Sequence, residues 1–353
     1  MRRFLPLALP LLLVACDSRS PAPEPSPSPA AAPTPLTDTA TPPAPASLQT
    51  FGDWAAGCDN GATCQAGSLV PDDGEPPALT LSIERAAGPG AGITIRLHGD
   101  APALPLTFAV DAQPVARGGT ARGEWTELTG EPAIALARKL AAGRTMTITD
   151  ANGTPLAAPS LKGAGAALRW IDTQQGRAGT TGALVATGTR PDTHPAPALP
   201  VVRAPTIRGE AALLDPLLIT QMRQTAKCDG DELPDVTTKP LGNGQTLAIV
   251  PCTVGAYNVL SALFVVERGA ATPATFDMAP AGDAPDDAPL VFNAGFADGI
   301  LSADARGRGL GDCGVAQRYS WDGTRFRLIE QRQMDECRGN IDPIRTWTVR
   351  LIR

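Results

Sequence analysis

Two short runs of alternating residues, separated by a glycine-rich turn, decide the fold class of this chain. Residues 79–98 read LTLSIER, then AAGPGAG, then ITIRLH. Apolar side chains occupy every second position of both runs, namely Leu79, Leu81 and Ile83 in the first and Ile93, Ile95 and Leu97 in the second. This two-residue period is typical of strands with one buried face. Because only a short turn separates the runs, the stretch predicts antiparallel β-structure.

Similar runs continue on both sides of this pair. We expect further strands at 51–58, 63–69, 106–110 and 145–149, and in the second half at 246–251, 258–267, 290–293, 315–321, 324–333 and 346–352. Asp322-Gly323, between two alternating runs, is a strong hairpin signal. Helical patterns cover 132–142, 164–175 and 210–225, and Asp215 before Pro216 marks a cap or restart inside the last. The predicted fold class is mainly β with a few helices (α+β).

A proline-rich stretch at residues 187–207 divides the folded part of the sequence. It holds few residues that could pack in a core, so we interpret it as a linker. We therefore expect an N-terminal β domain at 48–186 and a C-terminal β domain at 208–353. Both are predicted to be antiparallel, sandwich- or barrel-like, and braced by disulfides. A length of 353 residues is sufficient for two such domains.

Charge and histidine content exclude several classes of function. The formal net charge is -6, and the basic residues are scattered, which argues against nucleic-acid binding. The chain has only two histidines, His98 and His194, so a His-based triad or a multi-His metal site is not expected. The motifs Gly-x-Ser-x-Gly and His-Glu-x-x-His are absent. We predict no metal and no cofactor.

The first sixteen residues predict an export signal. Arg2 and Arg3 precede an uncharged apolar stretch at 4–14, which is shorter than the roughly 18–20 residues that a membrane-spanning helix needs. The stretch ends in LVAC at 13–16, which resembles the bacterial lipobox and predicts lipidation of Cys16. An ordinary signal peptide with an incidental cysteine is the alternative. Residues 1–16 are therefore interpreted as a lipoprotein signal peptide.

Residues 17–47 are rich in proline and alanine and contain almost no large apolar side chain. Such a composition predicts a disordered tether, which in extended polyproline II form reaches up to roughly 95 Å. The expected location is the cell envelope, lipid-anchored and facing the periplasm. Asp17 resembles the signal that holds lipoproteins in the inner membrane of enteric bacteria, which favours the inner over the outer membrane.

Six cysteines remain once Cys16 is lipidated, and an exported chain meets an oxidising compartment. Six cysteines allow fifteen pairings. Proximity in sequence favours three local disulfides, Cys58 with Cys64, Cys228 with Cys252, and Cys313 with Cys337. A zinc site is the alternative, but no Cys-x-x-Cys spacing occurs and neither histidine lies near a cysteine pair.

Two polar clusters are candidates for ligand binding. A glycine-rich run, GRGLGDCG at 307–314, follows Arg306, and with Arg308 and Asp312 it could hold an anion on its backbone N–H groups. A turn ordered by the Cys313 disulfide is the structural alternative. The second cluster lies where the helix at 164–175 should end, and comprises Asp172, Gln174, Gln175 and Arg177. Helix capping and a local ion pair would explain it equally well. We expect both clusters to be accessible, although the sequence does not show that they meet.

Two acidic segments offer carboxylate oxygens, the hard ligands that suit calcium. One is 229–235, DGDELPD, and the other contains Asp283, Asp286 and Asp287. The first departs from the calcium loop because it lacks that loop's glycine at the sixth position and its terminal glutamate. We interpret both segments as solvated acidic turns.

Several motifs resemble one bacterial family. These are FGDW at 51–54, CDN at 58–60 with Cys64, LKG at 161–163, ALR at 167–169, DTQQGR at 172–177, PCTVGAYN at 251–258 and GRGLGDCG at 307–314. Together they resemble the family called domain of unknown function 1176, over about residues 51–350. The front half is also similar in layout to the invasion-associated locus B family of periplasmic β domains. Neither resemblance implies an established reaction or an assigned catalytic residue.

Two functional hypotheses follow. The first is a non-catalytic binding or interaction module of the cell envelope, held at the membrane by its lipid, with an envelope protein or a glycan as partner. The second is an envelope hydrolase that acts on glycan or peptide through a pair of carboxylates, which sequence alone does not exclude. A lipid anchor, a long spacer and disulfide-braced β domains favour the first.

Overall fold

A computed structural model describes residues 42–72, 74, 79–99, 102–229, 233–281 and 288–353. The predicted signal peptide with Cys16, the predicted tether up to residue 41, residues 230–232 of the first acidic segment, and Asp283, Asp286 and Asp287 lie outside these residues. Within the described ranges, no helix has both the length and the apolar character needed to cross a bilayer.

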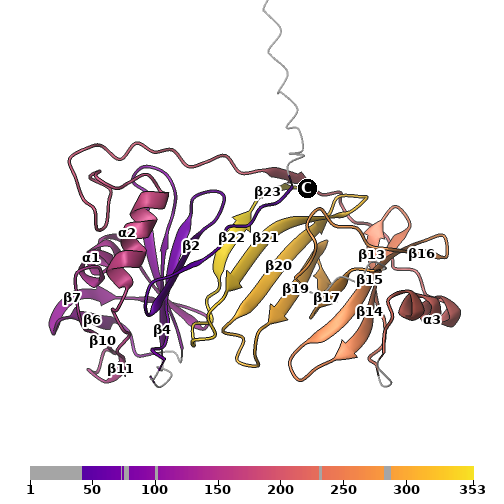
Figure 1. Cartoon of the computed structure of the whole chain (residues 1–353), viewed down its shortest axis with the longest axis horizontal. Coiled ribbons are helices and arrows are strands. Elements are labelled where there is room, and N and C mark those ends of the chain that lie inside the picture. The colour runs from indigo at the N-terminus through magenta and orange to yellow at the C-terminus, as the bar shows by residue number, and fades with distance from the viewer. Residues whose placement is uncertain (1–41, 73, 75–78, 100–101, 230–232, 282–287) are drawn as a thin grey trace, which may run out of the picture. The chain divides into compact units, whose positions relative to one another are not determined.

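The N-terminal half contains two antiparallel sheets (Figure 1). The first follows the order β1 (Gln49–Thr50), β2 (Trp54–Cys58), β3 (Cys64–Ser68), β4 (Thr80–Arg85), β5 (Ile93–His98), β9 (Trp125–Thr129) and β8 (Thr120–Arg122). The second follows the order β11 (Pro155–Ala157), β10 (Met146–Thr149), β6 (Leu106–Val110) and β7 (Gln113–Gly118). Two helices pack on these sheets, α1 (Gly130–Leu140) and α2 (Ala164–Gln174).

The alternation in residues 79–98 has the predicted consequence. In the antiparallel pair β4–β5, Leu81 lies opposite Leu97 and Ile83 opposite Ile95. All four side chains are buried in one core, together with Leu136 of α1 and Leu168 of α2 among others. Burying each such side chain stabilises the fold by about 1.5–3 kcal/mol. The core of this half is thus built on the runs that predicted it.

The C-terminal half contains two further antiparallel sheets and a third helix. One sheet comprises β13 (Thr237–Gly242), β14 (Gln245–Val254), β15 (Val259–Glu267) and β16 (Ala270–Pro273), with β17 (Leu290–Phe292) also paired to β15. The other follows the order β18 (Gly295–Ala297), β19 (Ile300–Arg306), β20 (Gly314–Trp321), β21 (Phe326–Met334) and β22 (Ile344–Thr348).

The two C-terminal sheets share a core. Leu247 and Leu263 of the first sheet are buried with Leu301, Tyr319 and Phe326 of the second. α3 (Pro216–Thr225) packs near β14, as Figure 1 shows, and its Met222 is buried in a separate cluster. The prediction of a mainly β fold with a few helices is therefore confirmed.

The third helix is shorter than predicted. It begins at Pro216 and not at residue 210. The Asp215 side chain accepts a hydrogen bond from the backbone N–H of Leu217 at 2.7 Å, which makes it the N-cap. Pro216 occupies the first turn, where its missing N–H costs nothing. The sequence signal at these two residues therefore marked a true helix start.

The predicted linker contains a strand that was not expected. β12 (Val201–Arg203) pairs in parallel with β23 (Arg350–Ile352), and both Val201 and Val202 are buried. At the other end of the described chain, the Ala46 N–H donates to the Thr346 carbonyl at 3.1 Å. Residues assigned to the linker and to the end of the tether thus pack against the fold.

All three predicted disulfides are present. They join Cys58 to Cys64, Cys228 to Cys252 and Cys313 to Cys337. The first closes the β2–β3 hairpin, where the two cysteines lie directly opposite each other. Each of the other two closes a segment with a sequence separation of 24. The local pairing predicted from sequence proximity is confirmed.

Candidate functional site

The polar cluster at the end of α2 is buried, contrary to our expectation. The Asp172 side chain has 0 % exposure, and its Oδ1 accepts a hydrogen bond from Nη1 of Arg85 at 2.7 Å. Its carboxylate also accepts the backbone N–H groups of Leu184, Val185 and Ala186. Burial, with the charge of Arg177 nearby, lowers the pKa of Arg85 to about 10. Asp172 therefore anchors the segment that follows α2.

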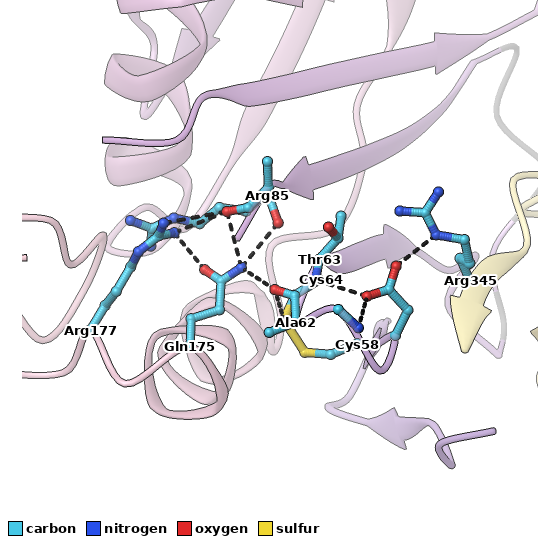
Figure 2. The surroundings of a disulfide bond; sticks show 11 residues. Cys58, Ala62, Thr63, Cys64, Arg85, Gln175, Arg177 and Arg345 are labelled. Atoms are coloured by element: carbon cyan, nitrogen blue, oxygen red, sulfur yellow. Dashed lines mark hydrogen bonds and ion pairs between the residues drawn. A yellow bond between two sulfur atoms is a disulfide. The ribbon is translucent and has the colours of Figure 1, made fainter. Parts of the chain in front are cut away.

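Gln175 links the same helix end to the first disulfide hairpin. Its Nε2 donates to the carbonyls of Ala62 at 2.8 Å and Arg85 at 3.0 Å, and its Oε1 accepts from Nη1 of Arg177 at 2.6 Å. Figure 2 shows the Gln175 amide between the Arg177 guanidinium and Ala62, beside the Cys58–Cys64 bond. Arg177 also forms an ion pair with Asp192 at 3.2 Å.

This geometry corrects the accessibility that we predicted. Asp172, Gln175 and Arg177 are all buried, and of this cluster Gln174 alone is exposed. The physical reason is that residues 177–192 fold back over the end of α2, so core packing does require these polar groups. Within the described chain, no hydrogen bond or ion pair joins them to the Arg306–Asp312 segment.

The second predicted cluster forms a loop, residues 307–313, between β19 and β20; we call it the glycine loop. Gly307, Gly309, Leu310 and Gly311 are exposed, but Asp312 is buried, so the accessibility that we expected is wrong for Asp312, whose carboxylate is held inside by its hydrogen bonds. Asn258 holds one side of its base, because its Nδ2 donates to the Arg306 carbonyl at 2.9 Å and its Oδ1 accepts from the Arg306 N–H at 3.2 Å. The Tyr257 hydroxyl donates to the Gly307 carbonyl at 3.3 Å. The motif at 251–258 thus positions the motif at 307–314.

An internal ion pair and a disulfide hold the other side of the glycine loop. Nε of Arg308 donates to Oδ1 of Asp312 at 2.7 Å, and Oδ2 of Asp312 accepts from the Gly339 N–H at 2.6 Å. The hydrogen bond from Arg308 lowers the pKa of Asp312; burial opposes the shift, and the Gly339 N–H adds to it. Gly314 ends the loop at φ +132°, where a Cβ would collide with the Ala305 carbonyl. The loop is therefore rigidly supported.

A hollow of about 430 Å³ lies beside the glycine loop. Its lining includes Val70, Pro71, Leu310 and Ile341, which are apolar, with Arg308 and Arg338 among the polar groups. Leu310 is 70 % exposed and Tyr257 is 42 % exposed. A Cβ on Gly309 would lie 3.8 Å from the Tyr257 ring, so the loop backbone approaches that ring. We call this exposed region, made of Tyr257, Arg306, Arg308, Leu310 and the hollow, the glycine-loop surface.

Arg338, which sequence reasoning missed, connects this surface to the N-terminal half. It lies in the β21–β22 loop, residues 335–343. Its Nη2 contacts Oδ1 of Asp53 at 2.6 Å, its Nε donates to the Val70 carbonyl at 2.7 Å and its Nη1 donates to the Gly52 carbonyl at 3.1 Å. Burial raises the pKa of Asp53, but hydrogen bonds from Ser160 and Arg338 outweigh it, and the net shift is downward.

Other residues of the same region extend this connection. Asn340 is fully buried and donates to the Ser68 carbonyl at 2.9 Å. Nε of Arg345, which Figure 2 labels, contacts Oδ2 of Asp59 at 2.7 Å. The Asn60 side chain donates to the Thr348 carbonyl and accepts its N–H, at 2.9 and 2.8 Å. The motifs at 51–54 and 58–60 therefore serve to join the two halves.

Among the described residues, no group of three or more His, Cys, Asp or Glu side chains is placed to hold a metal ion. Asp229 and Asp235, the described aspartates of the first acidic segment, belong to no such group. The Asp229 carboxylate instead accepts a hydrogen bond from the Thr253 hydroxyl at 3.2 Å.

The family described as protein of unknown function, DUF1176, matches residues 48–352. The chain belongs to this family. A relative, the uncharacterised protein YpfG of Escherichia coli K12, is 29 % identical over 320 residues, which cover 83 % of this chain and 89 % of YpfG. The crystal structure of invasion-associated protein B from Bartonella henselae is 19 % identical with a TM-score of 0.28, and the match covers 37 % of this chain and 99 % of that one.

Proposed function

We propose that this DUF1176 protein is a non-catalytic binding module, lipid-anchored at Cys16 in the inner membrane and facing the periplasm, which docks an envelope protein on its glycine-loop surface. The observation that carries the proposal is the composition of this surface. An aromatic residue, a leucine and two arginines lie exposed on one rigid loop and its neighbour. Tyrosine and arginine are enriched among the residues that dominate protein–protein binding energies.

Rigidity is the second support. The Cys313–Cys337 disulfide, the Arg308–Asp312 pair and the Tyr257 hydroxyl each fix part of the loop. A surface that is already ordered loses little conformational entropy when a partner binds. Leu310 therefore remains exposed on a fixed backbone.

Charge indicates the chemistry of the partner. In the Arg308–Asp312 pair the carboxylate side chain is 1 % exposed, whereas the arginine side chain is 43 % exposed. Arg306 is 45 % exposed, and its pair with Asp304 lies at the surface, where such pairs contribute little. A partner therefore meets guanidinium groups beside apolar side chains. The complementary partner is a protein that presents apolar side chains flanked by carboxylates.

Three described carboxylates, those of Asp53, Asp172 and Asp312, do not favour the alternative, a hydrolase. Such an enzyme needs a general acid whose pKa is raised. The pKa values of Asp53 and Asp312 are both lowered, and each carboxylate contacts an arginine. Asp172 is buried, and its carboxylate accepts hydrogen bonds from the Arg85 side chain and from three backbone N–H groups.

The test uses Leu310→Ala and a matched control. Leu217, on α3, is 74 % exposed and is not part of the glycine-loop surface, so Leu217→Ala removes a similar exposed side chain. Proteins cross-linked to the full-length chain in the native envelope would be identified, and the purified partner titrated against each variant. We expect Leu310→Ala to weaken binding at least about fivefold, and Leu217→Ala to leave it unchanged. Equal effects of the two substitutions would contradict the proposal.

A further inference from the structure

A short segment before α3 carries a fully exposed leucine between two carboxylates. Residues 210–215 read EAALLD, and we call them the acidic leucine segment. Leu213 is 100 % exposed, and Glu210 and Asp215 are exposed as well. An apolar side chain flanked by carboxylates is the chemistry that the glycine-loop surface calls for in a partner. The chain therefore carries its own match to that surface.

The packing of the protein does not use the Leu213 side chain. Its neighbour Leu214 packs, with Leu218 and Ile219 of α3, against the buried cluster that covers this side of the sheet. Leu213 has no such contact, because its side chain is wholly in solvent. For the same reason it does not touch Leu310 of its own chain, so any contact between the two leucines joins two copies.

Few large apolar side chains are exposed in the part of the chain that the structure describes, and they fall in two regions. Leu213 and Leu217 lie at the start of α3, whereas Val254, Tyr257 and Leu310 lie at the β14–β15 turn and in the glycine loop. Carboxylates flank the first region and guanidinium groups flank the second. Exposed apolar groups with charges of opposite sign around them are complementary as the two sides of an interface.

Arg308 is the cation of the glycine-loop surface that is available to a second copy. Its side chain is 43 % exposed, whereas that of its partner Asp312 is 1 % exposed. Nε and Nη2 of Arg308 donate to Asp312, and within the described chain Nη1 makes no hydrogen bond, so donors remain on the outer edge of the guanidinium. Two accessible carboxylates near this surface are paired with other arginines, namely Asp304 with Arg306 and Asp72 with Arg338.

The acidic leucine segment offers acceptors for those donors. Oδ1 of Asp215 accepts the Leu217 N–H as the N-cap of α3, which leaves Oδ2 for a second donor. Glu210 is exposed two residues after Arg208, which is exposed too. The segment and this flank therefore present two carboxylates and one cation to a partner.

We propose that the acidic leucine segment of one copy docks on the glycine-loop surface of a second copy, with Leu213 beside Leu310 and the hollow of about 430 Å³, and with Glu210 or Asp215 toward Arg308. The inference rests on the proposed function, because it uses the same surface, and it makes a second copy a competitor of the envelope partner. Since the two contacting regions differ, the association is head to tail, and each pair keeps one free segment and one free surface.

Sedimentation velocity of the full-length chain at increasing concentration measures this association. Leu213→Ala removes the docking side chain and Leu310→Ala alters the surface that receives it, so each should weaken self-association at least about fivefold. An equimolar mixture of the two variants should associate with the wild-type affinity, but only into pairs, because one variant keeps the segment and the other keeps the surface. Gln174→Ala, exposed on α2, is the matched control and should behave as the wild type.

A charge variant tests the polar part of the contact. Glu210→Gln combined with Asp215→Asn removes both carboxylates, while asparagine keeps the N-cap of α3. This variant should associate more weakly than the wild type and with less dependence on salt. All variants share the N-terminal residues of the wild type, so association through those residues would be common to all of them.

The outcomes separate this inference from the proposed function. A wild type that stays monomeric at the highest attainable concentration, a mixture that does not associate, or an effect of only one of the two leucine substitutions would overturn the head-to-tail contact. If Leu310→Ala nevertheless weakens binding of the envelope partner, the proposed function stands without it. If the mixture associates but Leu310→Ala binds the envelope partner normally, the self-association stands and the proposed function fails.

Discussion

Replacing Gln175 with alanine should destabilise the protein strongly, whereas replacing its neighbour Gln174 should not. The two glutamines are adjacent in sequence at the end of α2, but Gln174 is exposed and Gln175 is 5 % exposed. Gln174→Ala is therefore a matched control, because it deletes the same side-chain atoms at an exposed position. Substitutions at exposed positions of this kind usually change stability by no more than about 0.5 kcal/mol.

The expected magnitude follows from the bonds that Gln175 makes. Gln175→Ala removes two neutral hydrogen bonds, to the carbonyls of Ala62 and Arg85, and one charge-assisted bond from Arg177. At about 1 kcal/mol for each neutral bond and about 1.5–3 kcal/mol for the charged one, the loss is about 3.5–5 kcal/mol. If about 300 residues unfold together, the midpoint of thermal unfolding falls by about 6–8 °C.

Urea unfolding followed by tryptophan fluorescence, together with calorimetry, measures both variants against the wild type. We expect a large loss of unfolding free energy for Gln175→Ala and almost none for Gln174→Ala. Partner binding at the glycine-loop surface should survive in the folded fraction of both. If Gln175→Ala unfolds within about 0.5 kcal/mol of Gln174→Ala, the buried network does not stabilise the fold and the reasoning fails.

Three further predictions concern the loop and the connection between the halves. Because the folded pKa of Asp312 is lowered, its carboxylate stabilises the fold above its unfolded pKa of about 3.9 and loses that effect as pH falls through the folded pKa. Asp312→Asn should therefore lower stability at pH 7 and reduce the loss of stability on acidification below the unfolded pKa, as measured by urea unfolding at each pH. Replacing both Cys313 and Cys337 by serine should cost about 3.5 kcal/mol on the loop-entropy model and weaken partner binding, whereas an unchanged unfolding midpoint would argue against a structural disulfide. Proteolytic cleavage within residues 193–199 should give two fragments that co-elute in gel filtration until denatured, because buried bonds such as Asn340 to Ser68 cross between the halves; separate elution would refute this.

The predictable part of the fold rested on local signals. Alternation in 79–98 fixed which faces of β4 and β5 are buried, and sequence proximity was enough to pair Cys313 with Cys337. Asp215 and Pro216 marked a helix start because capping depends on neighbouring residues only. β12 was not predicted, because its pairing with β23 connects Val201 to Arg350, far apart in the sequence. A strand of three residues carries too little periodicity to be recognised alone.

The same limit explains the two candidate clusters. A polar helix end has the same sequence whether solvent or protein covers it, and only the fold shows that residues 184–186 close over Asp172. The glycine loop is a turn as predicted, because glycines beside a cysteine indicate a turn locally, but the burial of Asp312 depends on the distant Gly339 and could not be predicted. The exposed apolar side chain of Leu310 was not predicted to matter, because a single leucine between glycines belongs to no helical or strand pattern.

Contacts from the β21–β22 loop show that several of the family motifs have a structural role. Arg338 and Gly339 of this loop contact Asp53 and Asp312, and Arg345, which follows in β22, contacts Asp59. One short stretch of chain therefore contacts the two motifs at 51–60 and the distant motif at 307–314. A motif aspartate here supports the fold whether or not it meets a ligand, because its removal leaves a partly buried arginine without its ion-pair partner. Substituting Asp53 or Asp59 therefore cannot separate function from folding. An exposed side chain that pairs with no buried group can, which makes Leu310 the informative position for the glycine-loop surface.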